Sequence, residues 1–114
     1  MSLSINNSIS ALNALATKQS VTANNIANSE TREFKKSTTV LEESSTGAVS
    51  AKPQLVNTPG VMTQQPDGTL EETSNVDLIQ ETTDMITTRH AYEANLKALN
   101  ISTEMEDTVL DMMG

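Results

Sequence analysis

The chain has 114 residues, enough for one domain with a modest hydrophobic core. Apolar residues make up 36% of it but aromatic residues only 2%, which predicts a weakly stable monomer, and the lack of cysteine excludes disulfide and thiolate chemistry. The net charge of −8 argues against nucleic acid and anionic membranes as partners, and no stretch approaches the roughly 18 apolar residues that insert into a membrane.

The first predicted element is a helix of about 23 residues, which would be roughly 35 Å long. Ser4 is its predicted N-cap, and it ends near Asn28, a residue type that tolerates the left-handed conformation at a helix C-terminus. Its apolar positions follow alternating steps of four and three, which is the pattern of a coiled-coil seam. The members of this predicted seam are Ile5, Ile9, Leu12, Ala16, Gln19, Ala23 and Ile26.

The middle of the chain is short and polar, and we expect it to contain β-structure that cannot fold alone. Residues 31–41 are β-like, and residues 51–56 contain Pro53, which confines that segment to an edge strand. The sequence Gln65-Pro66-Asp67-Gly68 is typical of a turn, because proline fixes φ and glycine accepts positive φ. A β-hairpin is therefore predicted around this turn, with strands at 61–64 and 69–71.

A second helix is predicted from Ser74 to Met113, because no proline or glycine interrupts that stretch. Ser74 and Asp77 fit a capping box, in which the serine hydroxyl accepts from the free N–H groups of the first turn and the carboxylate reaches back. A helix of about 38 residues would span roughly 57 Å and would overhang the first helix.

The second helix carries two apolar stripes when it is wound at about 100° per residue. A single antiparallel helix can cover only one of them, so the other must meet another helix, another copy of the chain or solvent. The core of a three- or four-helix bundle is one explanation, but the chain supplies only one other long helix, which favours self-association. The first stripe comprises Leu78, Met85, Tyr92, Leu96, Leu99 and Leu110, and the second comprises Ala91, Ala94, Ala98, Ile101, Met105, Val109 and Met112.

Subunit contacts are predicted on both helices, from the seam of the first and from the second stripe of the other. The methionines near the C-terminus fit this prediction, since flexible thioethers suit adaptable interfaces as well as gaps in a core. The predicted contact residues are Ile5, Ile9, Leu12, Ala91, Ala98, Ile101, Met105 and Met112.

Few side chains could carry catalysis or bind a metal ion. The one histidine, His90, has Glu93 on the same helical face, but this spacing occurs once, and a surface histidine beside a carboxylate is the better interpretation. The adjacent carboxylates Glu42-Glu43 and Glu71-Glu72 are interpreted as solubilising charges, because neighbours in a strand point to opposite faces. With neither a phosphate-binding glycine loop nor a zinc motif, the sequence predicts no enzymatic activity, no cofactor and no metal.

Two specific motifs lie at opposite ends of the chain. The first is Ala23-Asn24-Asn25-Ile26-Ala27-Asn28-Ser29-Glu30-Thr31-Arg32-Glu33-Phe34, and the second runs from Ser74-Asn75-Val76-Asp77-Leu78 to Ala91-Tyr92-Glu93-Ala94-Asn95 and Met105. Together they resemble the paired signatures of the bacterial flagellar rod, hook and hook-associated proteins. The matching positions are Asn24, Asn25, Ile26, Ala27, Asn28, Thr31, Phe34, Asn75, Val76, Tyr92, Ala94 and Asn95.

One position departs from the family pattern. The family has a glycine directly before the aromatic residue of the first motif, and this chain has Glu33 there. A glycine at that place implies a positive φ, which glutamate adopts reluctantly. The sequence alone therefore leaves the φ of Glu33 in this turn open.

The resemblance implies a mainly α fold. The N- and C-terminal helices would pair as a long antiparallel, coiled-coil-like hairpin, with a small β-hairpin region between its arms. The expected organisation is one domain, with an N-terminal helix of the assembly region at 1–30, a short β and loop region at 31–73 and the long C-terminal helix at 74–114.

The resemblance also implies a structural function, as a subunit of the flagellar basal-body rod. The short middle and the sequence Asp67-Gly68-Thr69-Leu70 are most similar to the C-type proximal-rod protein. The implied partners are other rod subunits, copies of the chain itself and the flagellar export apparatus. The implied location is the periplasmic rod, reached without a cleaved signal peptide, since the N-terminus lacks a basic and an apolar signal region. A cytoplasmic helical-hairpin adaptor or chaperone-like binding module is the alternative.

Overall fold

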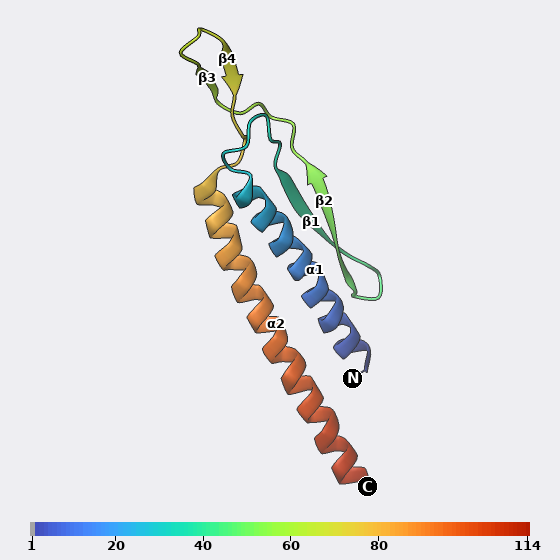
Figure 1. Ribbon diagram of the computed structural model, residues 1–114. Coiled ribbons are helices and arrows are strands. Elements are labelled where there is room, and N and C mark those ends of the chain that lie inside the picture. Colours follow the sequence, from blue (N-terminus) through green and yellow to red (C-terminus); the bar gives the residue numbers. More distant parts are fainter. Residues whose placement is uncertain (1) are drawn as a thin grey trace.

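Two helices dominate the fold of the chain. A computed structural model describes residues 2–114, in which helix α1 spans Ser2–Ala27 and helix α2 spans Leu78–Met113. Two antiparallel β-hairpins lie between them in the sequence, so the predicted mainly α fold with a small β region is confirmed (Figure 1). The strands are β1 (Ser37–Glu43), β2 (Val49–Leu55), β3 (Met62–Gln64) and β4 (Leu70–Glu72).

The molecule is a narrow rod of 78 × 24 × 13 Å. Its radius of gyration is 20.1 Å, whereas a compact domain of this length would have a radius of about 13 Å. Figure 1 shows α1 and α2 side by side and running in opposite directions, with both termini toward the same end. Because α2 has 36 residues and α1 has 26, the C-terminal part of α2 extends past the beginning of α1.

Both predicted N-caps are wrong. Helix α1 begins at Ser2, so Ser4 lies inside its first turn. Helix α2 is capped by Asp77, whose carboxylate accepts from the backbone N–H groups of Ile79 (3.1 Å) and Gln80 (3.4 Å). Ser74 precedes the helix in extended chain, where its Oγ accepts from the backbone N–H of Val76. The carboxylate fails to reach back as a capping box requires, because it is itself the cap.

The hairpin β1–β2 covers the side of α1 that faces away from α2 (Figure 1). Asn7 Nδ2 donates to the carbonyl of Thr46 (3.2 Å), and Ser10 Oγ accepts from the N–H of Val49 (3.0 Å), so the hairpin is fastened to α1 near its turn. The predicted strand at 31–41 begins only at Ser37. Pro53 lies opposite Thr39 in an edge strand, as expected, because a two-stranded sheet has no central strand.

The smaller hairpin β3–β4 forms where the turn sequence predicts it. Gly68 has a φ of +90°, and its N–H donates to the carbonyl of Gln65 (2.9 Å). The Asp67 carboxylate accepts from the hydroxyl (2.7 Å) and the backbone N–H (3.0 Å) of Thr69, and these hydrogen bonds lower the pKa of Asp67. Proline, aspartate and glycine therefore each act in the turn as their chemistry predicts.

Three of the seven members of the predicted seam of α1 are wrong. Leu12 is buried and Ile5, Gln19 and Ile26 are half-buried, but the alternate members Ile9, Ala16 and Ala23 are exposed. Helix α1 is packed on two sides, by α2 and by β1–β2, so its covered face is centred away from the seam that a single partner would cover. The residues that take the places of the exposed members are Ser8, which is half-buried, and Leu15 and Thr22, which are buried.

Candidate assembly surface

Helix α2 meets α1 along a polar arc and the adjoining edge of the first apolar stripe. The side chains of α2 that this contact covers most completely are Glu81 and Thr88, and Asn95 and Ser102 continue the same seven-residue spacing as half-buried positions. At about 100° per residue this arc lies between the two stripes. Helix α1 therefore covers neither stripe completely: Met85 and Leu99 of the first stripe and Ala91 of the second are half-buried, and the larger part of both stripes is open.

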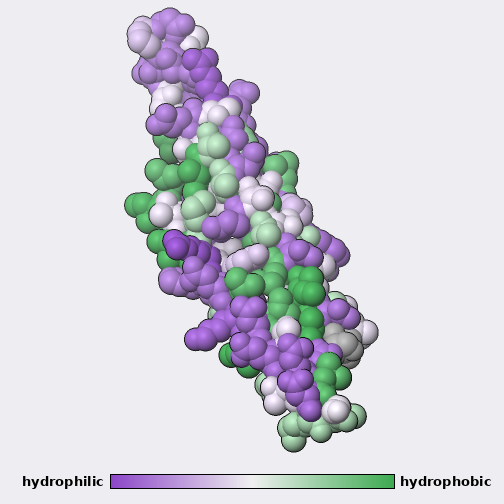
Figure 2. Space-filling model, turned by 60° about the horizontal axis from the view of Figure 1, so that its bottom comes forward, coloured by the Kyte–Doolittle hydropathy of each residue, from purple (hydrophilic) through white to green (hydrophobic). Residues whose placement is uncertain are grey.

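The two stripes remain largely exposed along α2. On the second stripe Ile101, Met105 and Met112 are 47%, 57% and 82% exposed. Figure 2 shows hydrophobic patches open to solvent along the body of the molecule, separated by hydrophilic ones. Scattered exposed apolar residues are normal, but an ordered series along one helix is typical of a contact surface. The other exposed apolar residues of α2 are Leu78, Ile79, Ile86, Tyr92, Leu96, Val109, Leu110 and Met113.

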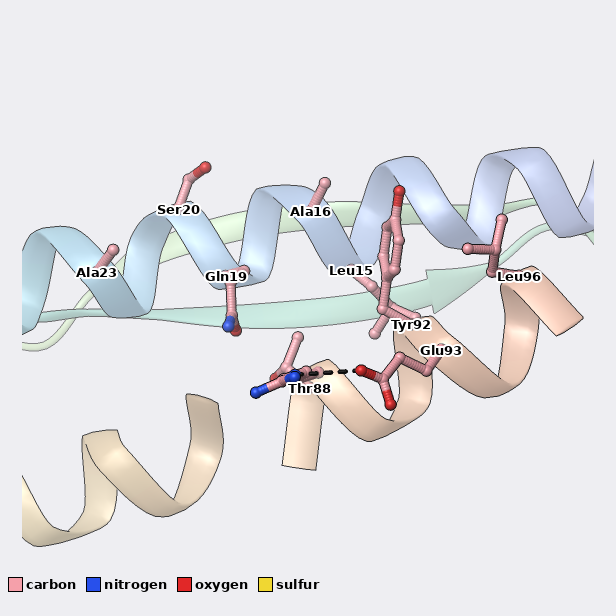
Figure 3. Close-up of a pocket in the computed structure, with 10 residues that line it drawn as sticks. Leu15, Ala16, Gln19, Ser20, Ala23, Thr88, Tyr92, Glu93 and Leu96 are labelled. Atoms are coloured by element: carbon pink, nitrogen blue, oxygen red, sulfur yellow. Dashed lines mark hydrogen bonds and ion pairs between the residues drawn. The ribbon is translucent and has the colours of Figure 1, made fainter. Parts of the chain in front are cut away.

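An open groove of about 590 Å³ follows the line between α1 and α2 on the side of the first stripe. Figure 3 shows Tyr92 and Leu96 of α2 beside Leu15 and Ala16 of α1, with the tyrosine ring upright against α1. Arg89 Nε pairs with Glu93 Oε1 at 3.1 Å along one wall. Small and apolar side chains therefore form a channel into which a further helix can pack.

The first motif asparagine, Asn25, is fully buried where α1, β1 and α2 meet. Its Nδ2 donates to the carbonyl of Ser37 (2.7 Å) and to Glu81 Oε2 (3.2 Å), and its Oδ1 accepts from the N–H of Ser37 (3.1 Å). A buried amide whose donors and acceptor are used in this way orders the backbone around it. Asn25 thus joins the end of α1 to the start of β1 and to the first turn of α2.

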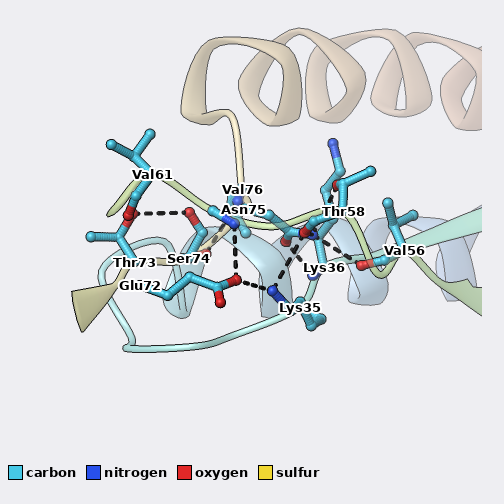
Figure 4. A network of polar contacts seen from close by, with 11 residues as sticks. Lys35, Lys36, Val56, Thr58, Val61, Glu72, Thr73, Ser74, Asn75 and Val76 are labelled. Atoms are coloured by element: carbon cyan, nitrogen blue, oxygen red, sulfur yellow. Dashed lines mark hydrogen bonds and ion pairs between the residues drawn. The ribbon is translucent and has the colours of Figure 1, made fainter. Parts of the chain in front are cut away.

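The second motif asparagine, Asn75, holds Lys36, the residue directly before β1 (Figure 4). Its Oδ1 accepts from the N–H of Lys36 (2.7 Å), and its Nδ2 donates to the carbonyls of Val56 and Thr58 (2.9 Å each). The two motifs come from opposite ends of the sequence, and the structure brings them together at Lys36 and Ser37. Their shared role in this chain is to fasten β1–β2 to the base of the helix pair.

The turn that leaves α1 is built by Asn28 and Thr31. Asn28 Nδ2 donates to the carbonyl of Asn24 (2.9 Å) at the helix end, and Thr31 Oγ1 donates to Asn28 Oδ1 (3.0 Å). Glu33 has a φ of +58°, and it is the one non-glycine residue with positive φ in the part of the chain that the structure describes. The left-handed conformation implied at this position is therefore confirmed, with glutamate adopting it.

Two ion pairs tie this turn to β4. Arg32 pairs with Glu71, and Lys35 pairs with Glu72, whose Oε1 also accepts from the N–H of Gly60 (3.0 Å). The hydrogen bond from Lys35, and then that from Gly60, lowers the pKa of Glu72 (Figure 4). A Cβ added at Gly60 would lie 1.9 Å from the carbonyl oxygen of Thr73, so the close approach of these backbones requires glycine there.

The remaining predicted residues fall into three groups. Leu12 is enclosed by its own chain and belongs to the core, whereas Ile5 and Ala91 are half-buried. Asn95 is half-buried and donates to the carbonyl of Ala91 (2.8 Å), which is a bond within its own helix. Half-buried motif residues are Ile26, Phe34 and Val76, and exposed predicted residues are Asn24, Ala27, Ala94, Ile9 and Ala98.

Sequence reasoning missed the polar residues of the helix contact. Glu81 and Thr88 are separated by seven residues, and this heptad spacing was the available signal, but hydrophobic periodicity searches only for apolar members. His90 is exposed, and Glu93 pairs with Arg89 rather than with it. Among residues 2–114 no group of three His, Asp or Glu side chains is arranged to hold a metal ion. Neither described helix has an apolar stretch that could cross a membrane.

An elongated helical subunit with ordered apolar stripes open to neighbours is the form of a structural protein that functions in an assembly. The family of flagella basal body rod proteins matches residues 5–35, and the family of flagellar basal body rod FlgEFG protein C-terminal regions matches residues 67–112. The chain therefore belongs to the flagellar basal-body rod proteins, structural proteins of bacterial motility. A search of curated proteins finds no match.

Proposed function

We propose that this chain is a subunit of the flagellar rod that assembles with copies of itself and with other rod proteins into the tube linking motor to hook. The observation that carries the proposal is the orientation of α2, whose polar arc faces α1 while the larger part of both apolar stripes stays open. A monomer gains nothing from this arrangement, whereas a subunit surrounded by neighbours buries both stripes.

The two stripes flank the α1–α2 contact on different sides, so each subunit offers neighbours two unlike surfaces. Contacts between unlike surfaces build open helical assemblies when the rotation between subunits does not close. In the assembled rod, α1 and α2 act as a coiled-coil-like antiparallel hairpin within one assembly domain. The contacts proposed to neighbouring subunits are Ile5, Ile9, Ala91, Ala98, Ile101, Met105 and Met112, with Leu12 supporting α1 from inside.

Within the rod family, the sequence around the β3–β4 turn favours the C-type proximal-rod protein. The residues that support this assignment are Asp67-Gly68-Thr69-Leu70, followed by Ser74-Asn75-Val76. The hydrogen bonds of Asp67 and Asn75 give these residues structural roles at the turn and at the base of α2. Residues 31–73 then form the small β region that the helix pair carries.

Export through the flagellar type III apparatus, in an unfolded state and without a cleaved signal peptide, would bring the chain to the periplasm. The small core supports this route, since the described part of the chain has only three buried apolar side chains, Leu12, Ala14 and Leu15. A core of this size opposes unfolding weakly. An adaptor or chaperone would instead remain in the cytoplasm.

The proposal is tested by deleting the gene and complementing the strain with it. The deletion strain is expected to lose swimming and to show truncated, hookless rods by electron microscopy of basal bodies, and the intact gene is expected to restore both. Secretion of the chain by a strain that cannot complete its rod would separate a rod subunit from a cytoplasmic adaptor. Normal swimming with complete basal bodies would contradict the proposed function.

A further inference from the structure

The contact between α1 and α2 contains polar side chains that are covered but poorly paired. We call Gln19, Glu81 and Thr88 the polar seam. Gln19 Nε2 donates to the carbonyl of Met85 at 3.4 Å, and the only bond of the Glu81 carboxylate among the described residues is the one it accepts from Asn25 at 3.2 Å. Gln19 Oε1 and Thr88 Oγ1 are buried without a hydrogen-bond partner among residues 2–114. Figure 3 shows Gln19 pointing from α1 toward α2, where Thr88 lies.

A buried polar atom that loses water and gains no partner raises the free energy of the closed state. When α2 moves away from α1, the side chains of Gln19, Thr88 and Glu81 are hydrated again. The free energy gained by this hydration offsets part of the free energy lost with the apolar contacts. The seam therefore lowers the free energy needed to separate the two helices.

The opposite side of α1 is fastened differently. Asn25 exchanges two hydrogen bonds with the backbone of Ser37, at 2.7 and 3.1 Å, and Ser10 accepts from Val49 at 3.0 Å. Ala14 is buried on this side against the hairpin. Helix α2 itself makes no contact with β1 or β2 in the described chain. Separation of α2 from α1 can therefore leave α1 and β1–β2 in place.

We propose that α2 opens from α1 as a unit, turning at residues 74–77, while α1 and the hairpin β1–β2 stay packed. Asn75 anchors this hinge through its hydrogen bonds with Lys36, Val56 and Thr58. At the other end of α2, the C-terminal part extends past α1 and is not held by it. The role of the opening rests on the proposed function: it lets α2 adjust its position against neighbouring rod subunits before α1 and α2 pair in the assembled rod. Regions of low local stability are the ones that move in assembly.

Hydrogen exchange on the full chain, read by mass spectrometry, tests the opening, because a helix separated from its packing partner loses most of its stability, so that its backbone hydrogen bonds open and its amides exchange. The amides at 81–99, which lie alongside α1, are expected to exchange faster than those at 8–25 of α1. Thr88→Val keeps the shape and removes the unpaired hydroxyl, so exchange at 81–99 is expected to slow about ten-fold, a factor that corresponds to about 1.4 kcal/mol. Thr103→Val is the matched control, because Thr103 is exposed on the same helix, and we expect a change below two-fold.

Equal exchange of both helices in the unmodified chain would overturn the proposal, because it would mean that they open together. Equal effects of Thr88→Val and Thr103→Val would also overturn it. Gln19→Leu removes the unpaired polar group on the α1 side of the polar seam. It is expected to slow exchange at 81–99 in the same way, so the result does not depend on one variant. Exchange is measured without a rod, so a failed rod assignment would leave this result standing.

Discussion

Asn25 and Asn75 hold adjacent residues at the start of β1, the first residue of the strand and the one before it, although the two asparagines lie fifty positions apart in the sequence. Asn25 binds both backbone groups of Ser37, and Asn75 binds the N–H of Lys36. Each amide uses its donor and acceptor together, which a carboxylate or an apolar side chain cannot do. These contacts give the two motifs a structural explanation: they position the β region on the helix pair.

Asn25→Ala should destabilise the fold by about 3 kcal/mol, because it leaves the backbone groups of Ser37 and the Glu81 carboxylate without their partner. Urea unfolding followed by circular dichroism measures the loss. Asn24→Ala is the matched control, since Asn24 is the exposed neighbour, and its effect is expected to stay within about 0.5 kcal/mol. Similar losses for the two variants would contradict the role given to the buried amide.

Glu33→Gly should stabilise the fold by about 0.5–1 kcal/mol. Glycine relieves the cost of a side chain at a φ of +58°, although its greater freedom in the unfolded chain offsets part of the gain. The urea midpoint of the variant is expected to rise. Glu30→Gly, at a nearby exposed turn position without positive φ, should give no increase. If Glu33→Gly is no more stable than Glu30→Gly, the strain at Glu33 is refuted.

At the scale of the elements, the ion pairs between the 31–36 turn and β4 make stability depend on pH. The hydrogen bond from Lys35, followed by that from Gly60, lowers the pKa of Glu72 in the folded chain below its ordinary value of 4.5. A carboxylate with a lowered folded-state pKa stabilises the fold above its unfolded pKa and loses that contribution as the pH falls through the folded value. The small hairpin should therefore loosen in acid.

Glu72→Gln should remove this pH-dependent contribution. The difference in urea midpoint between the unmodified chain and the variant is expected to be largest near about pH 6 and to shrink as the pH falls through the lowered folded-state pKa of Glu72. Glu43→Gln, at an exposed position of β1, is the control and should show little such trend. A difference that stays constant with pH would rule out Glu72 as the source.

The elements differ in how far the sequence alone could predict them. Both long helices and the β3–β4 hairpin follow from local signals, namely uninterrupted helical sequence and the turn chemistry at Pro66, Asp67 and Gly68. The pairing of β1 with β2 was missed, because a two-stranded sheet resting on a helix needs little alternation of apolar residues. Two of its hydrogen bonds with α1 are made by Asn7 and Ser10, which look like surface residues in the sequence.

The packing of the helices was less predictable than their existence. The alternate positions Ile9, Ala16 and Ala23 were assigned to the seam of α1, yet Ser8, Leu15 and Thr22 are covered instead. A helix with one partner buries its most apolar face, whereas α1 has two partners on different sides. The packing of β1–β2 against α1 is a tertiary contact that no local sequence pattern indicates.

At the scale of the whole molecule, the distribution of apolar side chains is reversed from that of a typical monomer. The centre of the helix contact contains Glu81, Thr88 and Gln19, while Ile101, Met105 and Met112 are open to solvent. A single molecule 78 Å long with a radius of gyration of 20.1 Å has too little interior to bury these apolar side chains. Neighbouring subunits are the surfaces that can do so, which is the central claim of the proposed function.

The most direct test of this claim is incorporation of α2 variants into basal bodies. Ile101→Asp and Met105→Asp place a charge on the second stripe, and Asn100→Asp places the same charge at an exposed position of the same helix outside both stripes. In a strain lacking the chromosomal gene, both stripe variants should be exported but absent from purified basal bodies, and Asn100→Asp should be incorporated. Normal incorporation of Ile101→Asp or Met105→Asp would contradict the assignment of the stripe to subunit contacts.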